Sequence, residues 1–115
     1  MQLETWIDYR EDNWEEGYKI GLSNYGQVRS YNKNPNGNII KGGHINGYVT
    51  VNIKLANGKR RNFYLHKLLA KAFLEAGENE KAVLHLNHDK TDNRVTNLKW
   101  ATHKERYAHQ KTSPL

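Results

Sequence analysis

Residues 49–65 constrain the fold more than any other stretch of this chain, because their side chains alternate and the chain then reverses. Every second residue from 49 to 55 is apolar and the residues between them are polar, which is the period-2 pattern of a half-buried strand. The pair Asn57-Gly58 favours the two-residue turn of a β-hairpin. We therefore predict an antiparallel hairpin whose second strand spans residues 60–65.

After this hairpin the spacing of apolar residues becomes helical. A helix is predicted over residues 66–74, ending at Gly77 or leading there into a loop, because the apolar residues share one face: Leu65, Leu68, Leu69, Ala72 and Phe73. Strands are then expected at 83–86 and 97–102, around a polar loop. The last helix is predicted from residue 103 to about residue 110, with Thr102 as its N-cap. Residues 111–115 are expected to be frayed.

The first third of the chain gives weaker signals. Residues 1–17 are acidic and carry two tryptophans, so we expect a loosely structured segment whose tryptophans dock on the domain. Short strands near 18–20 and 27–31 flank the turn signal Ser23-Asn24-Tyr25-Gly26. Residues 32–46 are predicted to form a polar loop or a flexible hairpin.

These elements predict an α+β fold made of small antiparallel sheets or hairpins with a C-terminal strand–loop–strand–helix unit. We divide the chain into an N-terminal strand and loop module, residues 1–46, and a unit of hairpin, helix and C-terminal motif, residues 47–115. At 115 residues, both parts are expected to share one compact domain.

Charge and composition restrict the function classes. The chain has 18 Lys and Arg against 12 Asp and Glu, a net charge of +6, which favours a polyanionic partner such as DNA or RNA. It contains no Cys, which excludes disulfides, thiolate zinc sites and cysteine nucleophiles. No apolar run approaches the roughly 18–20 residues of a membrane span, and the N-terminus lacks signal-peptide features. We expect a cytoplasmic protein that makes no membrane contact.

The polar loop carries the residues with the clearest chemical meaning. Asn87-His88 follows a short apolar strand, and the chain returns through Asn97-Leu98-Lys99-Trp100 before the final helix. A histidine can take a proton from water near neutral pH. Asparagine amide oxygens can bind a metal ion or hold the histidine in one tautomer.

This ordered set resembles the HNH nucleases, which cut nucleic acid with one divalent ion in a ββα-metal unit. The resemblance implies that His88 is the general base, Asn87 a metal ligand and Asn97 a brace for the loop. Asp92 and Asn93 match the polar turn of the family, where Asn93 would stabilise the turn. The implied cofactor is Mg²⁺ or Mn²⁺, with Ni²⁺ or Zn²⁺ also compatible.

The final helix departs from the family pattern. Many phage and intron-homing members carry Glu-Asn where this chain has Glu105-Arg106, and the Asn is their second protein ligand. Arg cannot bind a cation. Either His109, at i, i+3 from Arg106, replaces the ligand, or the metal site is weakened and Arg106 contacts phosphate directly. We favour residual activity with His109 as a ligand.

The N-terminal half is similar to a DNA-binding module found ahead of HNH motifs in phage and homing endonucleases. The matching strings are Gly17-Tyr18-Lys19-Ile20, Ser23-Asn24-Tyr25-Gly26 and Val28-Arg29-Ser30. Basic residues also cluster around the hairpin turn, and such a ribbon can lie in a groove or along phosphates. We predict DNA contacts for Arg29, Lys54, Lys59, Arg60, Arg61 and Arg106.

Three functions follow, in this order. The first is a metal-dependent HNH endonuclease that nicks or cuts double-stranded DNA, as a monomer or homodimer, in the cytoplasm of a bacterial host if phage-encoded. The second is a DNA-binding protein on the same fold with weakened or lost catalysis. The third is a basic RNA-binding domain unrelated to the motif. His66 is assigned a structural role and His85 a place in the cleft, whereas His44 and His103 receive no function.

Overall fold

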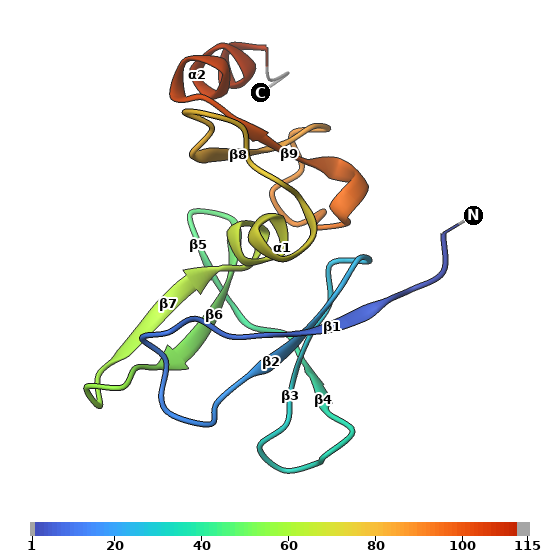
Figure 1. Cartoon of the computed structure of the whole chain (residues 1–115). Coiled ribbons are helices and arrows are strands. Elements are labelled where there is room, and N and C mark those ends of the chain that lie inside the picture. Colours follow the sequence, from blue (N-terminus) through green and yellow to red (C-terminus); the bar gives the residue numbers. More distant parts are fainter. Residues whose placement is uncertain (1, 113–115) are drawn as a thin grey trace.

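The computed structural model describes residues 2–112, and among these the strands form three antiparallel sheets. Helix α1 lies between the N-terminal sheets and the C-terminal unit of β8, β9 and α2 (Figure 1). The fold is therefore α+β, as predicted. Over the described part of the chain, neither helix has the length and apolar character that a membrane crossing requires.

The first sheet has the order β1-β2-β3-β4 and corrects the expectation for residues 1–17. Within that segment, β1 (Trp6–Tyr9) is an edge strand that pairs with β2 (Ile20–Ser23). The acidic sequence did not indicate this strand. Its residue Asp8 forms an ion pair with Lys19, just before β2, at 2.9 Å. Trp14 docks as expected and is only 1% exposed.

The boundaries of the next strands also differ from the prediction. β2 begins at Ile20, two residues after the expected start, and runs into the predicted turn because Ser23 is a strand residue. It pairs with β3 (Val28–Ser30). The hairpin alternative for residues 32–46 is correct, since β3 pairs with β4 (Asn38–Ile40) around Gly37, whose φ is 89°. A further strand, β5 (Gly43–Ile45), was not expected.

The predicted hairpin is confirmed as β6 (Tyr48–Lys54) and β7 (Arg60–Tyr64), and β5 pairs with the outer edge of β6. Helix α1 (Leu65–Phe73) begins one residue earlier than predicted. It ends before Gly77, because Leu74 is already extended. Gly77 therefore belongs to the exit loop, where its amide donates to the Glu80 carboxylate at 2.7 Å.

One hydrophobic core unites these elements across residue 46. It joins Trp14, Ile20 and Leu22 of the first part to Ile53, Leu69, Val83 and Leu98 of the second. The Trp14 ring makes edge contacts with Tyr9, Tyr18 and Phe63 at centroid distances of 5.6–6.0 Å. The N-terminal sheet and the hairpin are thereby fixed to the α1 side of the candidate site.

The C-terminal unit has the predicted order with shifts of one residue. It consists of β8 (Ala82–His85), the short 3₁₀ turn η1 (Val95–Asn97), β9 (Leu98–Ala101) and α2 (His103–Lys111). Thr102 caps α2, as predicted, in a reciprocal capping box with Glu105. Trp100 Nε1 donates to the carbonyls of Ala70 and Leu74, so β9 is tied to the end of α1. Of the tail expected to fray, residues 113–115 lie outside the described part.

Candidate active site

His88 stands on a tight turn directly after β8. Its amide donates to the His85 carbonyl at 3.0 Å, and the Leu86 amide donates to the Asn97 carbonyl at 2.8 Å. The φ of His88 is +65°, a left-handed conformation that non-glycine residues adopt rarely and often at functional sites. The turn thus holds the imidazole at the end of a strand in a backbone conformation that the surrounding hydrogen bonds maintain.

Asn97 connects the two ends of the loop that carries His88. Its Oδ1 accepts from the Asn87 amide at 3.1 Å, and its Nδ2 donates to Asn87 Oδ1 and to the Asp92 carbonyl, each at 2.9 Å. Asn87 Oδ1 also accepts from the Asp89 amide at 2.9 Å. Asn97 is buried, so its own three hydrogen bonds are partly shielded from competing water.

The polar turn beyond His88 contains two further anchors. Asp92 accepts from Asn87 Nδ2 at 2.8 Å and from Arg94 at 2.6 Å, and the hydrogen bond from Arg94 lowers the pKa of Asp92 to about 2. Asn93 is buried and accepts from His85 Nε2 at 2.8 Å. Burial lowers the pKa of His85, which favours a neutral ring below the loop.

His109 of α2 lies against His88. The two imidazole rings are stacked, with centroids 4.0 Å apart and planes 11° apart. His109 Nε2 donates to the His85 carbonyl at 2.9 Å, so a neutral His109 carries its proton on Nε2 and leaves Nδ1 as an acceptor. The structure therefore brings together two residues that the sequence placed 21 positions apart.

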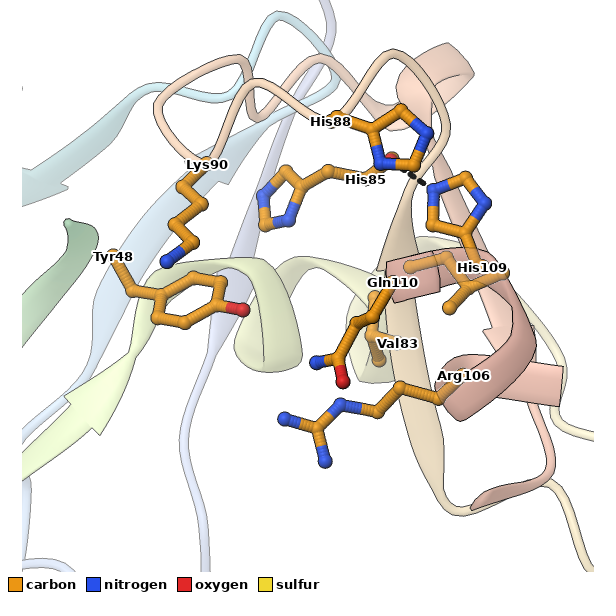
Figure 2. A pocket seen from close by; sticks show the side chains of 9 residues that line it. Tyr48, Val83, His85, His88, Lys90, Arg106, His109 and Gln110 are labelled. Atoms are coloured by element: carbon orange, nitrogen blue, oxygen red, sulfur yellow. Dashed lines mark hydrogen bonds between the residues drawn. The ribbon is translucent and has the colours of Figure 1, made fainter. Parts of the chain in front are cut away.

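The stacked pair borders a pocket of about 300 Å³. Figure 2 shows that the Arg106 guanidinium lies at the end of the pocket away from His88. Tyr48 and Lys90 line the side of the pocket that faces α2. The Lys90 ammonium lies 4.8 Å from the Tyr48 ring centroid. A polyanion entering this pocket would meet imidazole groups at one end and a guanidinium at the other.

The side chains allow only a loosely held metal ion. Nearly parallel rings direct their in-plane lone pairs along lines that do not converge, so His88 and His109 cannot both bind one ion in this arrangement. His109 Nδ1 and Asn87 Oδ1 remain as donors, and Asn87 Oδ1 already accepts two hydrogen bonds. The described residues contain no group of three or more His, Cys, Asp or Glu placed to hold a metal. This donor set fits an ion that takes most of its ligands from water and phosphate.

The predicted DNA-contacting residues fall on different surfaces. Lys54 and Arg60 face each other across the hairpin, and Lys54 also pairs with Glu15 at 3.1 Å. Arg61 pairs with Ile53, on the other face, and stacks on the Phe63 ring at 5.1 Å.

Two further basic residues lie apart from this pair. Lys59 is exposed beside the hairpin turn, where its amide is bound by Asn57. Arg29 belongs to the first sheet and lies 4.2 Å over the Trp6 ring. These five predicted DNA contacts are therefore divided among the two faces of the hairpin, its turn and a separate sheet.

Sequence reasoning missed Tyr48, Lys90 and Gln110 as residues that line the pocket. The hairpin pattern contained a signal for Tyr48, because it has the same even-numbered phase as the polar positions of β6. Tyr64 shares that face, and its ring lies 5.7 Å from that of Tyr48. The polar face of the hairpin therefore leads to the pocket.

The chain is similar to known HNH endonucleases in sequence and in fold. Residues 63–108 match the HNH endonuclease family. The chain is a relative of the HNH endonucleases. An uncharacterized HNH endonuclease of Acanthamoeba polyphaga mimivirus is 32% identical over 108 residues, covering 92% of this chain and 26% of that protein. A second from the same virus is 33% identical over 63 residues, covering 55% of this chain and 19% of that protein.

The fold is also similar to that of a solved HNH enzyme. The HNH homing endonuclease I-HmuI, whose structure concerns DNA binding and cleavage, superimposes with a TM-score of 0.70 at 30% identity. The match covers 94% of this chain and 58% of I-HmuI. The chain thus spans about a quarter or less of the two viral relatives and over half of I-HmuI. His88, Asn97 and Arg106 fall inside the HNH match, and His109 lies one residue beyond it.

Proposed function

We propose that this chain is a metal-dependent HNH endonuclease that hydrolyses phosphodiester bonds of double-stranded DNA. The observation that carries the proposal is the position of His88, on a hydrogen-bonded turn at the edge of a pocket that also contains cationic groups. Kinship with HNH endonucleases supports the same chemistry.

In this proposal His88 accepts the proton of the attacking water. The loop around it is held by Asn97, Asp92 and Asn93, which fix both the backbone and the neighbouring His85. Because the stacked His109 cannot bind the same ion as His88, the His88 ring stays available as a base. Arg106 and Lys90 are placed to attract the phosphate.

Asn87 Oδ1 and His109 Nδ1 would hold the divalent ion, with Mg²⁺ or Mn²⁺ as the expected metal. When bound, such an ion stabilises charge on the phosphate and on the leaving oxygen. Both protein donors are neutral, and Asn87 must release one hydrogen bond to bind. We therefore expect weak metal binding that improves when DNA supplies phosphate oxygens.

The DNA grip is assigned to the polar face of the hairpin β6–β7. Asn52, Lys54, Arg60 and Asn62 lie on this face, and Asn52 bonds both Asn62 at 3.0 Å and Arg60 at 2.6 Å. Lys59, Arg61 and Arg29 would add phosphate contacts from the turn and the neighbouring surfaces. Each chain contains one candidate site, so a monomer would nick one strand and a symmetric dimer could cut both.

Relaxation of supercoiled plasmid tests the proposal. We expect nicking by the wild-type chain with Mg²⁺ or Mn²⁺ and none with EDTA. His88→Ala should abolish nicking, whereas His44→Ala is the matched control because His44 is an exposed residue of β5. Metal-independent nicking, or equal nicking by both variants, would contradict the assignment of His88.

Metal binding has a separate readout in the thermal shift produced by Mn²⁺. His109→Ala should diminish that shift, and His103→Ala, on the exposed surface of the same helix, should leave it unchanged. An equal shift in both variants would remove His109 from the metal site without affecting the assignment of His88.

A DNA-binding protein with weakened or lost catalysis is the second candidate. It is favoured by Arg106, which cannot bind metal, and by the absence, within residues 2–112, of a group of three or more His, Cys, Asp or Glu placed to hold a metal. This alternative predicts salt-sensitive DNA binding that is equal in the wild-type chain and His88→Ala, with no nicking by either.

A further inference from the structure

A second, smaller pocket of about 100 Å³ lies next to the candidate active site. The two pockets share Tyr48, Val83 and Arg106. The rest of the small pocket is basic and aromatic, and its lining includes Tyr64, His66, Lys67, Lys81 and His103. Nothing in the catalytic proposal uses this space.

Helix α1 begins at the wall of this pocket. Tyr64 occupies its N-cap position without giving a side-chain cap, and the first turn contains no acidic residue. The partial positive charge of the helix N-terminus is therefore not compensated by a side chain. In α2, by contrast, the capping box of Thr102 and Glu105 satisfies the first turn.

His66 is an independent sign that the pocket is built for a ligand. It is only 4% exposed, lines the pocket, and its Nδ1 has no hydrogen-bond partner among residues 2–112. The ring packs between Tyr48, Tyr64 and His85 at centroid distances of 4.8–5.5 Å. With its proton on Nδ1, this ring presents a buried donor that has no protein partner, and a phosphate oxygen is an acceptor that could satisfy it.

The cations around the pocket are not neutralised by carboxylates. Within the described residues, the four ion pairs involve Lys19, Lys54, Lys71 and Arg94. Lys67 instead lies 5.6 Å from the Tyr64 ring centroid, and Lys81 and Arg106 are exposed. These charges, the uncapped helix and the donor of His66 all favour an anion.

We propose that the small pocket binds a backbone phosphate of the DNA, adjacent to the phosphate attacked at His88. Arg106 lines both pockets and would lie between the two phosphates, which explains a guanidinium at this position. The small pocket has about a third of the volume of the first pocket, which suits a phosphate group better than a nucleobase. This inference rests on the proposed function, since it assumes that DNA crosses the first pocket.

The test is the salt dependence of binding to a fluorescent 20-base-pair duplex in EDTA, where no cleavage can occur. One phosphate contact contributes about 0.9 to the slope of log affinity against log salt. The double variant Lys67→Gln/Lys81→Gln should therefore have a slope that is shallower by about 0.9. Between 0.1 M and 1 M salt, its affinity should then fall about eightfold less than that of the wild-type chain. Lys99→Gln is the control, because Lys99 lies in a separate depression beside Glu75 and Glu80. It should change the slope by less than half as much.

Three other outcomes would overturn the proposal. An unchanged slope in the double variant removes the phosphate contact. A change in Lys99→Gln of half that size or more reduces the effect to net charge, because Lys99→Gln removes one charge and the double variant removes two. Chemical shifts at His66 on adding inorganic phosphate, with normal DNA binding by the double variant, would assign the pocket to a free anion. The slope is measured without metal, so a failure of plasmid nicking would refute the catalytic proposal and leave this result interpretable.

Discussion

Removal of the Asn97 side chain should loosen the loop that carries His88. Asn97→Ala deletes three hydrogen bonds, to the Asn87 amide, the Asn87 side chain and the Asp92 carbonyl. A hydrogen bond contributes about 1 kcal/mol net, which gives an upper value of about 3 kcal/mol. Asn87 is exposed, so water can replace part of the loss, and we expect about 2–3 kcal/mol of destabilisation.

Thermal and urea denaturation measure this loss directly. For a chain of this length, about 4 °C of melting temperature corresponds to 1 kcal/mol, so Asn97→Ala should melt about 8–12 °C below the wild-type chain. Asn62→Ala is the matched control, because it removes one exposed hydrogen bond, to Asn52 at 3.0 Å. Its cost should stay within about 0.5 kcal/mol. If Asn97→Ala and Asn62→Ala melt together, the loop does not depend on Asn97 and the reasoning fails.

Three further predictions concern the supports of the site. Gly26→Ala should lower the free energy of unfolding by about 2 kcal/mol or more, because the φ of Gly26 is +86° and a Cβ would meet the backbone of Asn93 at 2.5 Å. Urea denaturation measures this loss, and an unchanged free energy of unfolding would contradict the close approach. Thr102→Ala should lower the free energy of unfolding by about 1 kcal/mol and reduce the helical circular dichroism signal. Thr102→Ser should preserve the free energy of unfolding and the signal, because Ser can also cap the helix. Burial lowers the pKa of His66 to about 3 from 6.5, so between these values the unfolded chain binds more protons. The contribution of His66 to the free energy of unfolding is therefore fully present above pH 6.5 and is lost as the pH falls toward 3. Melting temperatures from pH 7.5 to 5 should fall less steeply in His66→Phe, and identical profiles would contradict the assignment.

Local rules predicted those parts of the fold in which one face of an element is buried. The hairpin β6–β7 followed from alternation, and the N-cap of α2 from Thr102, because each signal lies within a few residues. The strand β1 was missed because it forms by pairing with a partner strand that is distant in the sequence. Such tertiary pairing leaves little trace in a charged segment.

The candidate site likewise has a part that local sequence predicted and a part that depends on tertiary packing. The order of Asn87, His88 and Asn97 predicted a compact loop, and their hydrogen bonds lie within eleven residues of the chain. Alternation gives the face of β6 on which Tyr48 lies. That Tyr48 and Lys90 line the pocket depends on how the hairpin packs beside the C-terminal unit, which no local pattern encodes. Arg61 was grouped with Lys54 and Arg60 around the hairpin turn, but strand register places its side chain on the other face of the hairpin.

The most direct test of the central claim is the single-turnover rate of DNA nicking by His88→Ala, with the protein in excess and Mn²⁺ present. A general base contributes about 10²- to 10⁴-fold to the rate. We predict a loss of that size with the DNA dissociation constant unchanged within about twofold, because a base acts on the reaction rather than on binding. A rate within threefold of the wild-type chain, or a loss matched by an equal loss of DNA affinity, would contradict the account.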